Sequence, residues 1–198
     1  MPDDFEKLAA DIRACRVCQP ALSHPCRPVL QGSASARIRI IGQAPGTRVQ
    51  ASGRPFTDPS GERLRHWMGV SEPEFYDPRL FAITPMAFCF PGLDAKGGDL
   101  PPRRECAPLW HDRVTASLPD LQMTLLVGLH AQRRYLNLPA SASLTSTVLR
   151  WRNFFPEYVA LPHPSWRNSG WLKRNPWFEN EVLPLLRSRI REILQRTL

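Results

Sequence analysis

The sequence predicts an α/β protein, with three α/β/α layers built on a central, mostly parallel sheet of four strands. Two observations lead to this prediction. Short apolar runs alternate with amphipathic segments, which is typical of strand–helix–strand units. The most distinctive loops, at 42–61, 85–91 and 162–170, each follow such a run, where α/β proteins bind ligands. A length of 198 residues suits one core, so we expect a single domain over 1–198.

The individual elements follow from periodicity along the chain. Apolar residues at helical spacing predict a first helix over 4–15, and a proline-punctuated loop follows over 18–32. The four strands are expected at 37–41, 80–84, 123–127 and 158–161. A second helix is expected to start near residue 58 and to end at 68. Three later helices are expected over 106–118, 129–136 and 178–198.

Charge and composition indicate a soluble protein with a polyanionic partner. There are 26 Lys and Arg residues against 18 Asp and Glu, a net charge of +8, and only three of the 26 are lysines. Arginine makes bidentate phosphate contacts and stacks on bases, although a GC-rich genome also raises the arginine content. No apolar run reaches the ~18 residues of a membrane span, and no secretory signal begins the chain, so we expect a cytoplasmic location.

Four of the five cysteines have the spacing of a metal centre. Cys15 and Cys18 form a Cys-x-x-Cys pair, and Cys89 and Cys106 offer two further thiolates. Four thiolates suit either Zn²⁺ or a 4Fe–4S cluster, and spacing alone does not choose between them. The alternative is a chance pair among scattered buried cysteines.

Four segments, in order, resemble the uracil-DNA glycosylase superfamily, most closely its iron–sulfur branch, often called family 4. The first is GQAPG at 42–46 with GRPF at 53–56 and Ser60-Gly61; the others are ITPMAFC at 83–89, Cys106, and HPS at 163–165. The resemblance implies an enzyme that flips uracil or a related deaminated base out of DNA and hydrolyses its glycosidic bond. It further implies a monomer that acts on single- or double-stranded DNA at the nucleoid. Cys15, Cys18, Cys89 and Cys106 would hold the cluster, with zinc as the alternative, and Cys26 lies outside the pattern.

The resemblance also assigns roles around the base. Phe56 would stack on the flipped base, and backbone groups near Gly42 would add hydrogen-bond donors. His163 would donate to the oxyanion that forms on the departing base. The alternatives are an ordinary core phenylalanine and a histidine that only caps its loop.

Three positions depart from the family pattern. Gln43 replaces a glutamate, and 47–50 reads TRVQ, with Val49 where relatives carry an acid. Asp58 is then the nearest carboxylate for catalysis, although Asp-Pro-Ser-Gly also favours a helix N-cap. Pro85 stands where the family has an asparagine that reads the base edge, so Thr84 or a backbone group would substitute.

The segment after HPS is expected to contact DNA. Ser165, Trp166, Arg167 and Asn168 combine aromatic, basic and polar groups suited to the gap that the base leaves. Trp177 and Phe178 are expected to dock the last helix, and His24 and His111 to be surface or loop residues. Because of Pro85 and Val49, a non-catalytic DNA- or lesion-binding protein of the same fold stays open as an alternative. Since the cysteine spacing also suits zinc, a zinc-stabilised protein with a nucleotide-like ligand and no DNA role is a third hypothesis.

Overall fold

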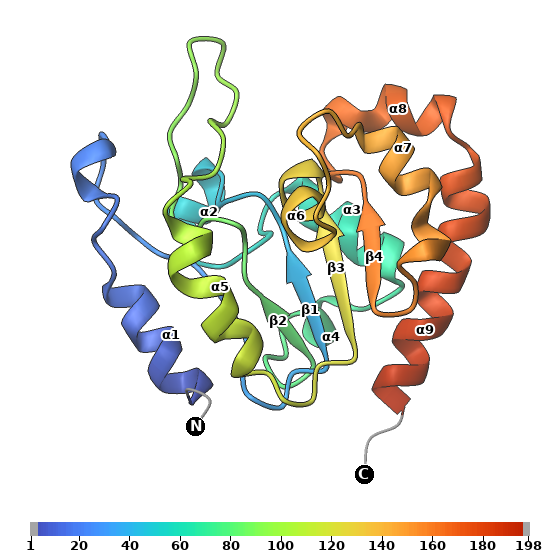
Figure 1. Ribbon diagram of the computed structural model, residues 1–198, viewed down its shortest axis with the longest axis horizontal. Helices are drawn as coiled ribbons and strands as arrows, with labels where there is room; N and C mark the ends of the chain where they lie inside the picture. The colour runs from blue at the N-terminus through green and yellow to red at the C-terminus, as the bar shows by residue number, and fades with distance from the viewer. Residues whose placement is uncertain (1–3, 196–198) are drawn as a thin grey trace.

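A parallel sheet forms the centre of the protein. The computed structural model describes residues 4–195. Its strands are β1 (Ile38–Ile41), β2 (Phe81–Ile83), β3 (Met123–Val127) and β4 (Tyr158–Leu161), in the order β2-β1-β3-β4 and all parallel. The predicted three-layer α/β/α fold and its four strands are confirmed (Figure 1). Nearly every strand residue is buried, as expected when helices cover both faces of a parallel sheet.

Helices α3 (Pro59–Met68) and α9 (Leu183–Gln195) cover one face of the sheet. Alternate strand residues such as Ile38 and Ile40 pack against their apolar sides in the largest core cluster. The predicted last helix begins with a π-helical turn, Phe178–Val182, before α9. Its expected end, 196–198, lies outside the described residues.

The opposite face carries α1 (Phe5–Ala14), α5 (Cys106–Ala116) and α6 (Leu129–Tyr135). Phe5, Leu8 and Ile12 of α1 are buried against α5, in agreement with the periodicity in the sequence. Because α1 ends at Ala14, the Cys-x-x-Cys pair follows it directly.

Several short helices occupy segments that the sequence pattern leaves as loops. They are α2 (Thr47–Ser52), α4 (Glu72–Phe75), α7 (Leu144–Leu149) and α8 (Ser169–Arg174), with 3₁₀ turns at Gln19–Ala21, Trp151–Asn153 and Trp166–Asn168. Each is six residues or fewer, too short to show a clear helical period. Over residues 4–195, no helix has the length and apolar character to cross a membrane.

The carboxyl ends of the four parallel strands lie at one edge of the sheet, where the loops after β1, β2 and β4 gather. The loop between β2 and α5 extends beyond this edge (Figure 1). Its outer part, residues 92–100, folds into a small hairpin closed by an antiparallel bridge between Leu93 and Asp99. We call residues 92–100 the 92–100 hairpin.

Candidate active site

A pocket lies at the carboxyl edge of β1 and β2. The segment after β1 contributes Gly42, Gln43, Ala44, Pro45, Gly46 and Val49, and the turn into α3 contributes Pro55, Phe56, Asp58 and Ser60. The remaining lining residues are Val29, Ile83, Pro85, Asp99 and His163. The structure therefore brings six residues singled out in the sequence to one cavity: Gly42, Gln43, Phe56, Asp58, Pro85 and His163. It adds one, Asp99, that the sequence analysis missed.

Two glycines allow Phe56 to occupy its position. A Cβ atom at Gly42 would lie 3.2 Å from the tip of the Phe56 ring, so the ring lies close to the first loop. A Cβ atom at Gly61 would lie 1.9 Å from the Phe56 carbonyl oxygen, so any side chain there would force this carbonyl to shift. Phe56 itself has a φ of 55°, in the left-handed region that side chains rarely adopt. Such a conformation persists only when its surroundings fix it.

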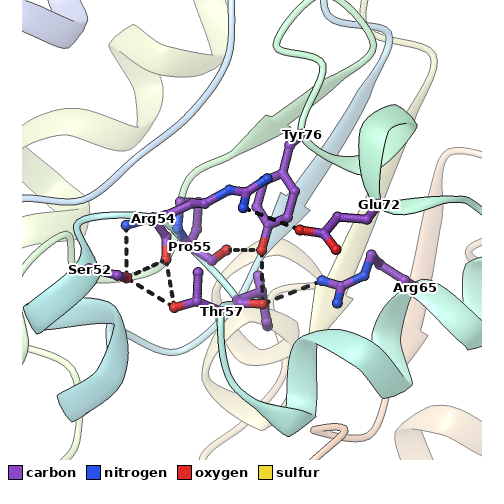
Figure 2. Close-up of polar contacts among 8 residues, drawn as sticks. Ser52, Arg54, Pro55, Thr57, Arg65, Glu72 and Tyr76 are labelled. Atoms are coloured by element: carbon purple, nitrogen blue, oxygen red, sulfur yellow. Dashed lines mark hydrogen bonds and ion pairs between the residues drawn. The ribbon is translucent and has the colours of Figure 1, made fainter.

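A polar framework fixes that turn (Figure 2). The Tyr76 hydroxyl is placed between two carbonyl oxygens, 2.9 Å from that of Pro55 and 3.0 Å from that of Phe56. The Arg54 guanidinium lies 3.4 Å above the Tyr76 ring and pairs with Glu72 at 3.2 Å. The framework holds the backbone of the turn and thereby sets the direction of the phenylalanine ring.

His163 enters the pocket from the loop after β4. Burial lowers the pKa of His163 below its usual value, and the carboxylates of Asp58 and Asp99 oppose this effect. The imidazole is therefore neutral at neutral pH and can donate one hydrogen bond. The Asn168 amide donates to the His163 carbonyl at 2.7 Å, which fixes the loop from within.

The segment after His163 divides into a supporting part and an exposed part. Asn168 is used inside the loop, and the Ser165 carbonyl accepts a hydrogen bond from Arg63 of α3 at 3.0 Å. Trp166 is 76% exposed, and the Arg167 guanidinium lies 5.7 Å from its ring centre. Trp166 and Arg167 are thus the two residues of this segment that are free to meet a large ligand.

The two carboxylates of the pocket differ in their surroundings. Asp58 caps α3: one carboxylate oxygen accepts from the Gly61 amide at 3.1 Å and from the Ser60 hydroxyl. In the part of the chain that the structure describes, the Asp99 carboxylate accepts no hydrogen bond. The N-cap alternative for Asp58 is the one that the geometry favours.

Thr84 and Pro85 follow β2 and take different places. Thr84 is fully buried, and its hydroxyl accepts from the Arg39 side chain at 2.7 Å, so it offers no surface to the pocket. Pro85 lines the pocket, and its carbonyl oxygen lies 3.1 Å from Nε2 of His111.

The expectation that His111 is a surface or loop residue is wrong, because its side chain is fully buried on α5. Desolvation beside Arg39 lowers the pKa of His111 to about 3, so the ring is neutral. Since a carbonyl oxygen only accepts, Nε2 carries the ring proton and donates a hydrogen bond to the Pro85 carbonyl. Nδ1 then accepts a hydrogen bond from the Tyr135 hydroxyl at 2.7 Å. His111 therefore supports the floor of the pocket from behind.

All five cysteines line a second pocket, between α1, α5 and the segment after β2. They are Cys15, Cys18, Cys26, Cys89 and Cys106. Burial raises the pKa of Cys89 and of Cys106 to about 12, and neighbouring cysteines contribute to both shifts. Cys26, which the sequence pattern leaves out, is a hydrogen-bonding neighbour of Cys89. Among residues 4–195, no three His, Cys, Asp or Glu side chains are arranged to hold a metal ion.

A basic groove adjoins the cysteine pocket. It is lined by residues of the loop before α5 and of α6, among them Arg103, Arg104, His130, Arg133 and Arg134. Arg134 pairs with Asp112 at 3.1 Å, while Arg133 donates to loop carbonyls.

Comparison with known families agrees with this geometry. The sequence model described as the uracil DNA glycosylase superfamily matches residues 30–187, which include every residue of the pocket except Val29. The match leaves out Cys15 and Cys18, so it does not bear on the full cysteine set. With four fifths of its length matched, the chain belongs to the uracil DNA glycosylase superfamily.

Proposed function

We propose that the protein is a DNA glycosylase that takes uracil, or a related deaminated base, out of the DNA stack and hydrolyses its N-glycosidic bond. The observation that carries the proposal is the meeting of Phe56 and a neutral His163 in one pocket at the carboxyl edge of the sheet. A base inside a duplex is out of reach, so the enzyme must receive it in a pocket of this kind.

The two residues supply different parts of the chemistry. The ring of Phe56 offers a flat apolar face against which a pyrimidine stacks. As the glycosidic bond breaks, negative charge develops on the carbonyl oxygens of the base, and His163 donates a hydrogen bond to one of them. A fixed donor to a developing oxyanion is worth about 3 kcal/mol in well-characterised sites. Because the His163 imidazole is neutral, one of its ring nitrogens carries a hydrogen and can donate to the base oxygen.

DNA would be held by groups around the pocket. Trp166 and Arg167 are exposed beside His163, and an aromatic ring next to a guanidinium suits the space vacated by a base. The net charge of +8 and the basic groove near Arg104 and Arg133 attract the phosphate backbone. We expect the protein to act on DNA as a monomer.

The cysteine pocket is proposed to hold a 4Fe–4S cluster through Cys15, Cys18, Cys89 and Cys106, as in the iron–sulfur branch of the superfamily. These four cysteines line one pocket and would supply the four thiolate ligands of such a cluster. Buried thiols with raised pKa values, such as those of Cys89 and Cys106, become thiolates only beside a strong positive charge, which bound irons would supply. Bound there, the cluster would tie α1 and the segment after β2 to α5. Zinc is the alternative occupant.

A non-catalytic DNA- or lesion-binding protein is the second candidate function. Pro85 favours it, because this position offers the base neither a side-chain donor nor an amide hydrogen. A site that lacks such a polar partner discriminates less between bases.

Base excision on labelled oligonucleotides tests the two functions. Single- and double-stranded substrates would carry uracil, hypoxanthine, xanthine or a mismatched thymine, and strand scission after alkali would report abasic sites. We expect cleavage at uracil, and a loss of about 100-fold or more in His163→Ala. His66→Ala, an exposed histidine on α3, is the matched control and should keep full activity. DNA binding without release of any base by the iron-loaded protein would establish the binding function instead.

A further inference from the structure

We propose that Asp99, carried to the pocket by the 92–100 hairpin, is the carboxylate that activates the attacking water. The inference rests on the proposed glycosylase function and deepens it. The first loop, where Val49 lines the pocket, holds no acid, and Asp58 is engaged as a helix cap. Asp99 is the other carboxylate lining the pocket.

The hairpin that carries Asp99 is internally ordered. One carboxylate oxygen of Asp94 accepts hydrogen bonds from the amides of Lys96 and Gly98, each at 2.8 Å. The Leu100 amide donates to the Gly92 carbonyl at 3.0 Å, across from the bridge between Leu93 and Asp99. These bonds define the turn, so the position of Asp99 is set by its own loop.

A side-chain contact fastens the hairpin to the first loop. The Gln43 amide nitrogen donates to the Leu100 carbonyl at 3.2 Å. A Cβ atom at Gly46 would lie 3.6 Å from Oδ2 of Asp99, so the carboxylate comes close to the same loop. A glutamate at position 43 has no N–H to donate and would repel the carbonyl. Gln43 and Asp99 are therefore linked features of one pocket, because the side-chain amide of Gln43 holds the hairpin that carries Asp99.

The Asp99 carboxylate is available for chemistry. Asp99 is exposed as a residue, so water reaches it from the mouth of the pocket. Partial desolvation raises the pKa of Asp99; Arg167 and His163 oppose this shift, while Asp58 and Asp94 add to it. A raised pKa makes a carboxylate a stronger base.

The proposed step balances without any further reactant. The bond between the sugar C1′ and the base nitrogen breaks, and its electron pair leaves with the base, whose oxyanion accepts a hydrogen bond from His163. The water oxygen bonds to C1′ as one of its protons passes to the Asp99 carboxylate. The base anion then takes a proton from solvent, and Asp99 releases its own. The products are the free base and an abasic site.

The test compares Asp99→Asn with the wild-type chain in single-turnover excision of uracil. Loss of a general base costs about 10²- to 10⁴-fold in rate, and we expect a loss in this range. Affinity for uracil-containing DNA should stay within about threefold, since the amide keeps the shape of the side chain. Asp99→Glu should recover part of the rate. Asp120→Asn, an exposed residue at the opposite edge of the sheet, removes the same charge and should change neither quantity.

A pH profile separates this role from a structural one. The wild-type rate should fall on the acidic side as Asp99 becomes protonated, and Asp99→Asn should lack that limb. An Asp99→Asn rate within threefold of wild type, or an unchanged acidic limb, would refute the assignment and leave the glycosylase function standing. A wild-type chain that releases no base would overturn both the function and this role.

Discussion

Gly61 packs so closely against the backbone of Phe56 that a Gly61→Ala substitution would displace Phe56. In a helix, replacing glycine by alanine normally stabilises by about 1 kcal/mol. At Gly61 of α3, the new Cβ atom would lie 1.9 Å from the Phe56 carbonyl oxygen, whereas ordinary contacts begin at 3.4 Å. The carbonyl must therefore move, and it would lose its hydrogen bonds from Tyr76 and Arg65.

The balance of these terms predicts the sign of the effect. A neutral hydrogen bond contributes about 1 kcal/mol and a charged one about 1.5 kcal/mol or more. Together with displacement of the Phe56 ring from Gly42, these losses exceed the helical gain, and we expect Gly61→Ala to destabilise the fold by about 2 kcal/mol. For a chain of this size, the melting temperature should fall by roughly 4–8 °C. Uracil excision should fall as well, because the stacking face has moved.

A matched glycine provides the control. Gly170 lies in α8, and a Cβ atom there would meet only the flexible end of Arg174, at 3.6 Å. Gly170→Ala should therefore be neutral or stabilising by up to about 1 kcal/mol. Thermal and urea denaturation of both variants give the comparison. A Gly61→Ala chain as stable as wild type, with full excision, would show that the turn does not depend on this close approach.

Three further perturbations address other parts of the molecule. The folded-state pKa of His111 is about 3, so below pH ~6.5 the unfolded chain binds a proton that the folded chain does not. The free energy of unfolding therefore falls by up to about 1.4 kcal/mol for each pH unit between pH ~6.5 and pH ~3. His111→Phe should flatten the slope of the denaturation midpoint between pH ~6.5 and ~4, and an unchanged slope would contradict the burial argument. For the proposed 4Fe–4S cluster, we expect about four irons per wild-type chain, a loss of most of them in Cys106→Ser and their retention in Cys26→Ser; equal iron contents in the two variants would remove Cys106 from the ligand set. Trp166→Ala should weaken binding to uracil-containing DNA about tenfold in fluorescence anisotropy without lowering the melting temperature, and unaltered affinity would exclude Trp166 from the interface.

The sequence was sufficient for the sheet because each strand is a short apolar run. Ile38–Ile41 and Met123–Val127 are buried on both faces, and such runs are recognisable without knowledge of their neighbours. The parallel order then follows from the helices that separate the runs, and it brings Gly42, Pro85 and His163 to one edge. Motif spacing was enough to anticipate that these residues meet.

The parts that were missed depend on contacts distant in sequence. His111 looks like any polar residue of an amphipathic helix, and only the packing of Arg39 and Tyr135 around it makes it buried and neutral. Cys26 fits no spacing pattern, yet its loop returns to Cys89. No local sequence pattern predicts these contacts of His111 and Cys26, because each is produced by the tertiary fold.

Asp99, the proposed general base, is also a residue whose surroundings depend on contacts distant in sequence. Its surroundings, LDAKGGDL, give the pattern of a polar turn, and turns are usually solvated. What distinguishes this turn is Gln43, which donates to Leu100 from the first loop. Asp99, Phe56 and His163 line the same pocket. In the proposed mechanism, the carboxylate on the separate hairpin would approach the sugar from the mouth of the pocket, while Phe56 and His163 would hold the base from within. Gln43 therefore does not argue against catalysis, because its side-chain amide fastens the hairpin that carries Asp99, the proposed base.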